Sequence, residues 1–245
     1  MRVYGVDLET NGFCPDKDRI TEIGAVVWDT DKHAPLHMTN VNLLCPEVTE
    51  ITADITRITG IDMAHLREFG RTDISNVLSG LGESMEQVGV CVAHNAPFDR
   101  GMLEAAFKRA SLSFPNVLWI DTRVDLPFHA GVKSRALNYV SADYKINPNP
   151  FAHRALFDVM QMLQLLDKFD INEVIERAKT PSVTVVAVTR PPWEDPSPVG
   201  EKDNDKAKAA GFHWDGGFKK WTRVCKANEV QDLMAKLPFP IKVKE

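Results

Sequence analysis

The chain has 245 residues, an ordinary content of apolar and charged residues and a net charge of −5, which suits one sizeable domain with a small additional module. No apolar run approaches the roughly 20 residues of a membrane-spanning helix, and the N-terminus lacks the basic and apolar pattern of a secretory leader. The four cysteines have no Cys-x-x-Cys spacing. We therefore expect free thiols in a reducing, cytoplasmic compartment, rather than disulfides or a zinc site.

The charge is distributed unevenly along the chain. Residues 202–245 contain ten Lys and Arg against six Asp and Glu, a balance of +4, so the rest of the chain carries −9. An acidic body followed by a basic module suggests a polyanionic partner that is held partly by the tail. Ordinary variation of charge between domains is the alternative.

The first predicted element is a strand from Arg2 to Glu9. Because side chains alternate between the two faces of a strand, Asp7 and Glu9 share one face at its C-terminal end, just before Asn11 and Gly12 break it. At about 4 Å and an effective dielectric near 20, two carboxylates repel by on the order of 4 kcal/mol. Such a pair persists only if one member is protonated or a cation lies between them. Two solvated surface acids are the alternative.

Alternating elements follow this strand. The later predicted strands of the main body cover residues 20–30, 37–45, 88–93 and 117–120. The predicted helices cover residues 51–58, 73–87, 97–110, 134–139, 154–169 and 170–179. Three strands with short connections indicate an antiparallel meander, and the alternation after it indicates helices on both faces. The expected fold is therefore an α/β domain with a mixed five-stranded sheet.

Polar side chains gather where the predicted strands end. In open α/β sheets, sites form at the carboxyl ends of strands, and the first and fourth strands end at Glu9 and near Asn95. Asp99 lies in the first turn of the next helix. Asp158 lies one turn inside the long helix, and His153 precedes it by five residues. A single helical Asp is usually ordinary surface, so only the convergence of all these residues would indicate a site.

The last third of the chain differs in composition. Residues 182–189 predict a β-branched strand and residues 190–200 a Pro-rich linker. The tail predicts a helix over residues 203–211, a hairpin over residues 212–224, a helix over residues 227–237 and a strand over residues 241–244. The expected domains are residues 1–180, a strand and linker over residues 181–201, and a small basic α+β module over residues 202–245.

Three motifs in the main body resemble those of a known enzyme family. They are Asp7-Leu-Glu9-Thr-Asn-Gly12, His94-Asn-Ala-Pro-Phe-Asp99 and His153-Arg-Ala-Leu-Phe-Asp158. Together, over about residues 1–170, they resemble the DnaQ-like (DEDDh) 3′→5′ exonucleases, which include polymerase proofreading subunits and the exonuclease X type. Asn11 departs from the pattern, since many members have a second Thr there.

This resemblance implies a ribonuclease H-like fold and a 3′→5′ exodeoxyribonuclease that releases nucleoside monophosphates. Carboxylate oxygens select Mg²⁺ or Mn²⁺, and two such ions clamp the entering and leaving oxygens of the phosphate. Asp7 is expected to bridge both ions. Glu9 and Asp158 would complete the ion that holds the attacking water, and Asp99 would support the other ion. His153 is the expected general base.

The resemblance also implies contacts with the 3′-terminal nucleotide. The expected residues are Thr10, Ile58, Thr59, Asn95 and Phe98. Phe98 would wedge or stack against a base, which is worth roughly 1–3 kcal/mol, although a place in the helix core is the alternative. Lys133 and Arg135 would hold phosphates further along the strand, unless they are simply solvated loop charges.

The implied partner is DNA with a free 3′ end, single-stranded or frayed, with a polymerase or other replication and repair proteins as further partners and no membrane. A bacterial or phage-encoded cytoplasmic protein fits this picture. An exoribonuclease of the same family is one alternative, since the same site cuts both polymers. A catalytically idle nucleic-acid-binding subunit is another, although the presence of all five motif residues argues against it.

The tail contains Gly211, Trp214, Lys219, Lys220 and Trp221 in a pattern that resembles a small module appended to phage and bacterial DNA-processing proteins. Aromatic side chains and lysines on a small hairpin suit single-stranded nucleic acid, by stacking and phosphate contacts. The alternative is that the two tryptophans form the core of the module.

Overall fold

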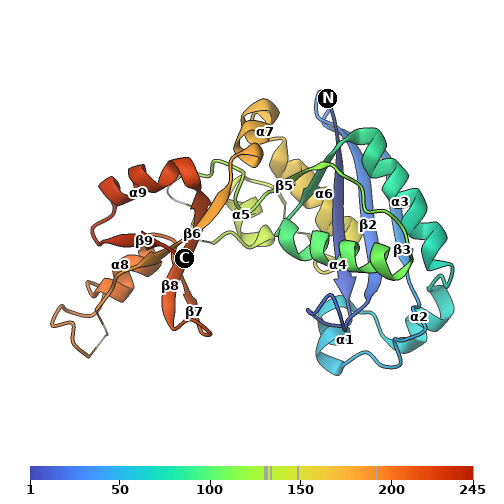
Figure 1. Cartoon of the computed structure of the whole chain (residues 1–245), viewed down its shortest axis with the longest axis horizontal. Coiled ribbons are helices and arrows are strands. Elements are labelled where there is room, and N and C mark those ends of the chain that lie inside the picture. Colours follow the sequence, from blue (N-terminus) through green and yellow to red (C-terminus); the bar gives the residue numbers. More distant parts are fainter. Residues whose placement is uncertain (130–131, 133, 148, 191–192, 245) are drawn as a thin grey trace. The chain divides into compact units, whose positions relative to one another are not determined.

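The computed structural model describes residues 1–129, 132, 134–147, 149–190 and 193–244. The chain divides into two compact units (Figure 1). The N-terminal unit comprises Met1–Leu126 and Ala136–Ala178, and the C-terminal unit comprises Pro127–Arg135 and Lys179–Glu245. None of the helices within the described ranges is long and apolar enough to cross a bilayer.

A five-stranded sheet in the order β3-β2-β1-β4-β5 forms the centre of the N-terminal unit. Its strands are β1 (Arg2–Thr10), β2 (Ile20–Asp29), β3 (Ala34–Asn42), β4 (Val90–Ala93) and β5 (Leu118–Asp121). The first three pair antiparallel, whereas β4 runs parallel to β1 and β5 parallel to β4. The predicted mixed sheet of a meander followed by parallel strands is thus confirmed.

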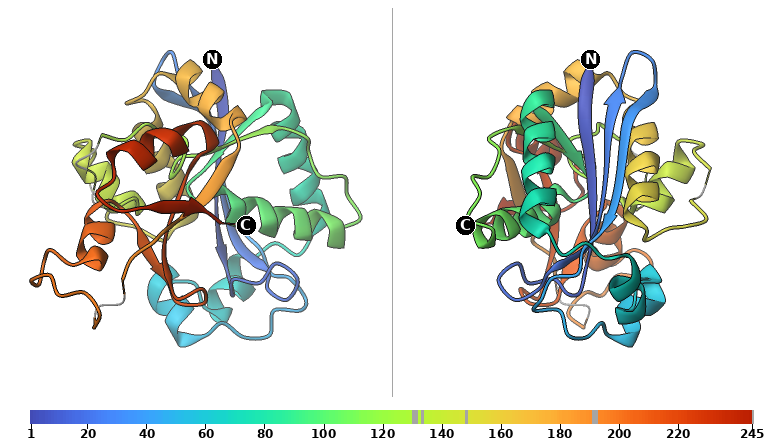
Figure 2. Two further views of the ribbon diagram at one scale, coloured as in Figure 1. Left: turned by 60° about the vertical axis from the view of Figure 1, so that its left-hand side comes forward. Right: turned by 90° about the vertical axis from the view of Figure 1, so that its right-hand side faces the viewer.

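Helices cover both faces of this sheet, which is nearly edge-on in the right-hand view of Figure 2. Tyr4, Val6 and Leu8 point from β1 into a core with α3 (Ile74–Val88) and α4 (Ala96–Arg109). The opposite face of β1, which carries Asp7 and Glu9, meets α6 (Ala155–Leu166) at Gly5. The remaining helices are α1 (Ala53–Thr59), α2 (Met63–Phe69), α5 (Leu137–Asp143) and α7 (Ile171–Lys179).

Three elements differ from the sequence predictions. Helix α2 was not predicted; it begins where the Asp62 side chain accepts the backbone N–H of His65. Helix α5 begins at Leu137, after Ala136, and is not capped by Ser134. Strand β3 ends at Asn42 because its register with Glu22 ends there, and Leu43 then bridges to Arg71. Local sequence does not show which partner a chain segment will pair with.

The C-terminal unit is a small α+β structure with an antiparallel sheet in the order β7-β8-β6-β9. Its strands are β6 (Ser182–Ala187), β7 (His213–Asp215), β8 (Lys220–Lys226) and β9 (Ile241–Val243). Its helices are α8 (Asp203–Ala209) and α9 (Val230–Lys236). Val185, Phe212, Cys225, Phe239 and Ile241 are central members of its core. Strand β6 lies in this sheet, so residues 182–187 belong to the same folded unit as residues 202–245.

The Pro-rich stretch before α8 includes residues 191 and 192, which lie outside the described residues. On either side of them the chain is held to the C-terminal unit by charged groups. Arg190 pairs with Asp203 and with Asp195, and Asp195, 5% exposed, accepts the backbone N–H groups of Ser197 and Asp203. These contacts anchor both ends of the stretch at the start of α8.

The backbone of α6 lies directly against β2 at Gly24. A Cβ atom built there would come within 2.3 Å of backbone atoms of Ala155 and Leu156, which a side-chain rotation cannot relieve. Gly24 also stands opposite Asp7 in the β1–β2 register. The absence of a side chain at this position therefore lets the first turn of α6, with Asp158, approach Asp7.

We expect Gly24→Ala to push α6 away from β2 and to lower the free energy of unfolding by about 1–3 kcal/mol, as overpacking does. Urea unfolding followed by circular dichroism measures this. Gly80→Ala is the matched control, because it lies in α3 with no atom within 4 Å of a built Cβ, and it should be neutral or stabilising by up to about 1 kcal/mol. Equal effects of the two substitutions would contradict the close approach.

Candidate active site

The four motif carboxylates come from three elements that meet at one edge of the sheet. Asp7 and Glu9 share one face at the end of β1, as the period of two predicts. Asp99 lies in the first turn of α4 and Asp158 in the first turn of α6. Asp99 is 2% exposed, and the backbone of Leu8 hydrogen-bonds its carboxyl group. Residues distant in sequence thus form one acidic cluster.

Asn95 sets the direction in which α4 leaves the strand. It adopts a left-handed conformation with φ 81°, which Asn tolerates better than most residues. Its backbone N–H donates to Asp121 Oδ1 and its side-chain oxygen accepts from Arg123 Nη1. Pro97 in the first turn then suits the start of the helix. This sharp turn after β4 directs the first turn of α4, with Asp99, toward the end of β1.

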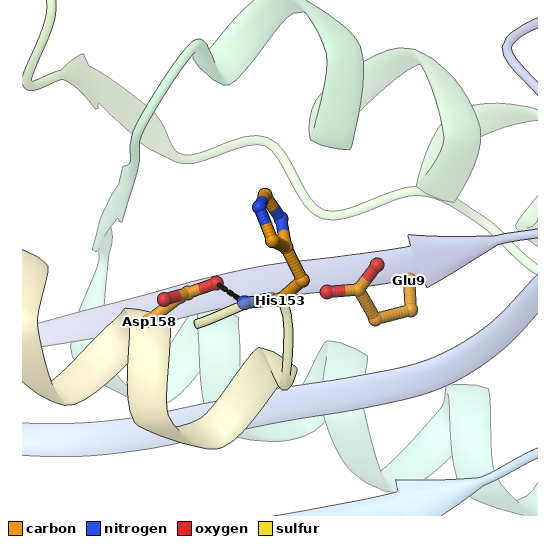
Figure 3. Close-up of side chains that lie close together, drawn as sticks. All are labelled: Glu9, His153 and Asp158. Atoms are coloured by element: carbon orange, nitrogen blue, oxygen red, sulfur yellow. Dashed lines mark hydrogen bonds between the residues drawn. The ribbon is translucent and has the colours of Figure 1, made fainter. Parts of the chain in front are cut away.

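A short loop before α6 orients Asp158. The backbone N–H of His153 donates to Asp158 Oδ2 at 2.8 Å, and the Asn149 side chain donates to Oδ1 at 2.9 Å. His153 has φ 65°, and its imidazole remains exposed. Figure 3 shows His153 between Glu9 and Asp158, and ligand atoms of the three residues all lie within 4.8 Å of one another.

The cluster is electrostatically unfavourable while it is ionised. Burial raises the pKa of Asp7 well above its ordinary value, and the charges of Asp99, Asp158 and Glu9 raise it further. Burial, followed by the charges of Asp158 and Glu22, raises the pKa of Glu9 to about 8. The pKa values of Asp99 and Asp158 are also raised, mainly by burial. A bound cation would remove this penalty, and the all-oxygen set of carboxylates fits Mg²⁺ or Mn²⁺.

Glu22 is a further residue of the site, and the sequence reading did not single it out. It lies on β2 opposite Glu9 in the register, and it is fully buried. Arg154 donates to its carboxylate from Nη2 at 2.7 Å and from Nε at 3.1 and 3.2 Å, and the backbone N–H of Ala155 donates at 3.0 Å. The sequence did contain a signal for a functional role of Glu22, since it is the one charged residue in the apolar run from Ile20 to Trp28.

This arrangement makes Glu22 an anchor for the residues beside the cluster. Its carboxylate accepts a free N–H at the start of α6, where the helix dipole also favours a negative charge. Arg154 follows His153 directly in the chain, so the ion pair fixes the segment that carries the imidazole. Arg154 also lowers the pKa of Glu9 and so offsets part of the repulsion that the Glu22 charge exerts there.

The residues expected to contact the terminal nucleotide have diverse surroundings. The hydroxyl of Thr10 donates to the Gly12 carbonyl at 2.6 Å, and Ile58 is 45% exposed. The hydroxyl of Thr59 donates to the Ile55 carbonyl and accepts the N–H of Ile61. Thr59 is therefore engaged within its own turn and is 7% exposed.

Phe98 packs partly against the core, and its ring centroid lies 6.2 Å from that of Phe13. Phe13 is 86% exposed and was not singled out in the sequence, although it directly follows the first motif. Lys133 lies outside the described residues. Arg135 lies over the Phe128 ring at 5.7 Å, within the C-terminal unit.

This arrangement, in which acids from three elements meet beside an imidazole at the carboxyl end of β1, is a candidate site for divalent metal ions. Residues 5–166 match the RNase T exonuclease family model, and the chain belongs to that family. The five-stranded sheet with flanking helices accordingly confirms the predicted ribonuclease H-like exonuclease fold, and structural neighbours include a DEDDh family member. Residues 5–166 thus form a domain of an exonuclease family.

Three comparisons illustrate the family match. The chain is 28% identical over 177 residues to a PolC-type DNA polymerase III of Caldanaerobacter subterraneus, covering 69% of this chain and only 12% of the polymerase. It is 28% identical over 181 residues to ribonuclease T of Buchnera aphidicola, covering 66% of this chain and 80% of that enzyme. The structure of exonuclease X in complex with 5′-overhanging duplex DNA shares the fold at 21% identity and a TM-score of 0.52, covering 72% of this chain and 99% of that one.

The raised pKa values predict a specific dependence of stability on pH. A carboxyl whose folded pKa lies above its unfolded value stabilises the fold fully below the unfolded pKa and loses this contribution as pH rises through the folded one. For Glu9 this window runs from its ordinary value of 4.5 to about 8. In chelator, the melting temperature should therefore fall between pH 5 and 8, and it should fall less in Glu9→Gln.

Added Mg²⁺ or Mn²⁺ should reverse this loss, by about 2.7 kcal/mol at a concentration of 100 times the Kd. Differential scanning fluorimetry at pH 8, with and without the metal, measures the shift. A melting temperature that does not respond to either ion would show that the carboxylates do not form a metal site.

We expect Arg154→Ala to lower the free energy of unfolding by about 3 kcal/mol, because it leaves the buried Glu22 carboxylate without its counter-ion. The lower end of the usual range applies because the Arg154 side chain is 33% exposed. Arg57→Ala is the matched control, since its pair with Asp54 is 73% and 88% exposed and should contribute at most about 1 kcal/mol. Urea unfolding of both variants tests the difference, and equal losses would remove the anchoring role of Glu22.

Proposed function

We propose that the protein is a 3′→5′ exodeoxyribonuclease that uses two Mg²⁺ or Mn²⁺ ions to hydrolyse phosphodiester bonds from the 3′ end of DNA, releasing nucleoside monophosphates. The observation that carries this proposal is the convergence of Asp7, Glu9, Asp99 and Asp158 at the sheet edge, with the exposed imidazole of His153 beside them. A family match alone does not specify the polarity or the sugar.

In this proposal each residue has a distinct role. Asp7, whose carboxyl interacts with those of Asp99, Asp158 and Glu9, would be a ligand shared by the two ions. Glu9 and Asp158 would hold one ion, and Asp99 would support the other. When bound, the ions stabilise the charge on the attacked phosphate and on the entering and leaving oxygens. His153 accepts the proton of the attacking water as general base, and the bond from its backbone N–H to Asp158 keeps its side chain beside the cluster.

The terminal nucleotide would lie beside this cluster. The proposed contacts are Thr10, Ile58, Thr59, Asn95 and Phe98. Because the Thr59 hydroxyl is already engaged by Ile55 and Ile61, its contribution would be shape rather than a hydrogen bond. Phe13 extends the aromatic surface of Phe98 into solvent, where stacking on a base would be worth roughly 1–3 kcal/mol.

Two relatives favour different substrates. The similarity to PolC-type DNA polymerase III supports DNA, and with it a role in replication, repair or proofreading beside a polymerase. The similarity to ribonuclease T supports the second candidate, a 3′→5′ exoribonuclease. We favour DNA with a free 3′ end, single-stranded or frayed. A catalytically idle subunit is the weaker alternative, because every motif residue is present. The free cysteines, of which Cys45, Cys91 and Cys225 are buried, support a reducing, cytoplasmic location.

Degradation of end-labelled strands tests the proposal directly. With Mg²⁺ or Mn²⁺, a 3′-labelled DNA strand should release its labelled mononucleotide first, whereas a 5′-labelled strand should shorten stepwise. The same assay on RNA decides between the two candidates. Release of the 5′ label first, or cleavage that is unaffected by chelator, would contradict the proposal.

Asp7→Ala should abolish cleavage because it removes the ligand shared by both ions, and His153→Ala should lower kcat by about 10²–10⁴-fold, as loss of a general base does. Asp54→Ala is the matched control, because this carboxylate is 88% exposed on α1 and should leave kcat unchanged. Cleavage that survives Asp7→Ala in a clean preparation would show that the site is assigned incorrectly.

A further inference from the structure

The two faces of the C-terminal sheet differ in what they carry. Val185, Ala187, Cys225 and Ile241 point into the core of the unit. Because cross-strand partners share a face, Thr222, Val186 and Lys242 point to the opposite side. On this side Val186 is buried, whereas Lys242 is exposed. Side chains two residues along a strand return to the same face, which adds Lys220 and Lys244. We call this surface, defined by Lys220, Lys242 and Lys244, the lysine face.

Positive charge predominates on the lysine face, although Asp215 stands opposite Lys220 in the β7–β8 register. Lys220 and Lys242 are exposed, as is Lys219 in the adjoining turn. Among the residues that the structure describes, none of these three lysines forms an ion pair. Lys244 adds a fourth positive charge. A surface of this kind is complementary to a polyanion and gains from releasing the counter-ions of its phosphates.

An aromatic ring is fixed beside these lysines. Phe218 is 52% exposed at the turn between β7 and β8. Its backbone N–H donates to Asp215 Oδ1 at 2.9 Å, which holds the turn, and the Lys244 ammonium lies 3.8 Å from the ring centroid. A nucleic-acid base could stack on the Phe218 ring while the neighbouring phosphates contact the lysines. Only an unpaired strand offers free base faces for this contact.

The tryptophans of the hairpin do not belong to this surface. Trp214 and Trp221 stand opposite each other in the register, so they share a face, and Trp221 packs against the core. Their rings meet edge to face at 5.8 Å. Trp214 therefore packs against Trp221 on the side of the sheet opposite to the lysines. The aromatic residue that contacts one of the lysines is Phe218.

We propose that the lysine face and Phe218 bind single-stranded nucleic acid without sequence preference. This function lies outside residues 5–166, to which the family model applies. As a second contact for a substrate strand it rests on the proposed nuclease function, and it would raise the effective concentration of long strands at the enzyme.

The test is fluorescence anisotropy of the full chain with labelled 30-nucleotide DNA and RNA strands, in chelator so that no cleavage occurs. Lys220→Ala/Lys242→Ala/Lys244→Ala should weaken binding about tenfold or more at low salt. It should also reduce the slope of log K against log[salt] by about 2, since each phosphate contact on a single strand contributes roughly 0.7. Phe218→Ala should weaken binding about fivefold or more and leave the slope unchanged.

The matched control is Lys206→Ala/Lys208→Ala/Lys236→Ala, which removes the same charge from α8 and α9 and should leave both quantities nearly unchanged. If it weakens binding as much as the lysine-face variant, the effect is one of net charge and the proposal is overturned. Equal affinity for a blunt 30-base-pair duplex also overturns it. If the triple variant does not fold, Lys220→Ala and Lys242→Ala, both at exposed positions, should each lower the slope by about 0.7.

Degradation of a five-nucleotide strand separates this proposal from the nuclease function. The lysine-face variant should degrade it at the wild-type rate and show a raised KM only for long strands. If the wild-type protein degrades no strand, the proposed nuclease function fails, but the anisotropy comparison still decides whether the lysine face binds.

Discussion

The mutual repulsion of four carboxylates at one sheet edge is the constraint on which the N-terminal unit depends. Folding brings Asp7, Asp99 and Asp158 together from three separate elements, and burial adds a desolvation cost to their repulsion. Hydrogen bonds from His153 and Asn149 to Asp158 offset only part of this cost. Protonation or a bound cation offsets the rest, so the acidic residues destabilise the fold when they are ionised and no ion is bound. Such tension between stability and activity is expected at a functional site.

The neighbouring carboxylates of Glu9 and Glu22 differ in how their charge is compensated. Glu9 and Glu22 stand opposite each other on β1 and β2, and Glu22 is satisfied within the protein by Arg154 and Ala155. Within the part of the chain that the structure describes, Glu9 has no hydrogen-bonded counter-ion, and its pKa is raised. The internal ion pair turns one acid into part of the scaffold. The other remains available for an external ligand. Together with the contact at Gly24, this pair determines where α6 begins and thus where Asp158 and His153 lie.

Features encoded in short stretches of sequence were predictable. The period of two on β1 placed Asp7 and Glu9 on one face, and local helix signals placed Asp99 in the first turn of a helix and Asp158 near the start of another. Features that depend on distant partners were not predictable. Glu22 bonds to Ala155 across 133 residues, and β6 pairs with strands that lie far along the chain. Helix α2 was missed because its short length gives little periodicity.

The separation of the two units has an electrostatic rationale. The acidic cluster repels a polyanionic strand until cations are bound, so the catalytic edge by itself offers little attraction to its substrate in the absence of metal. The lysine face attracts phosphates without any ion, and its residues come from β8 and β9, two strands that are brought into one sheet by β6. The basic residues and the acids thus belong to different folded units, each of which has a core and an electrostatic requirement of its own.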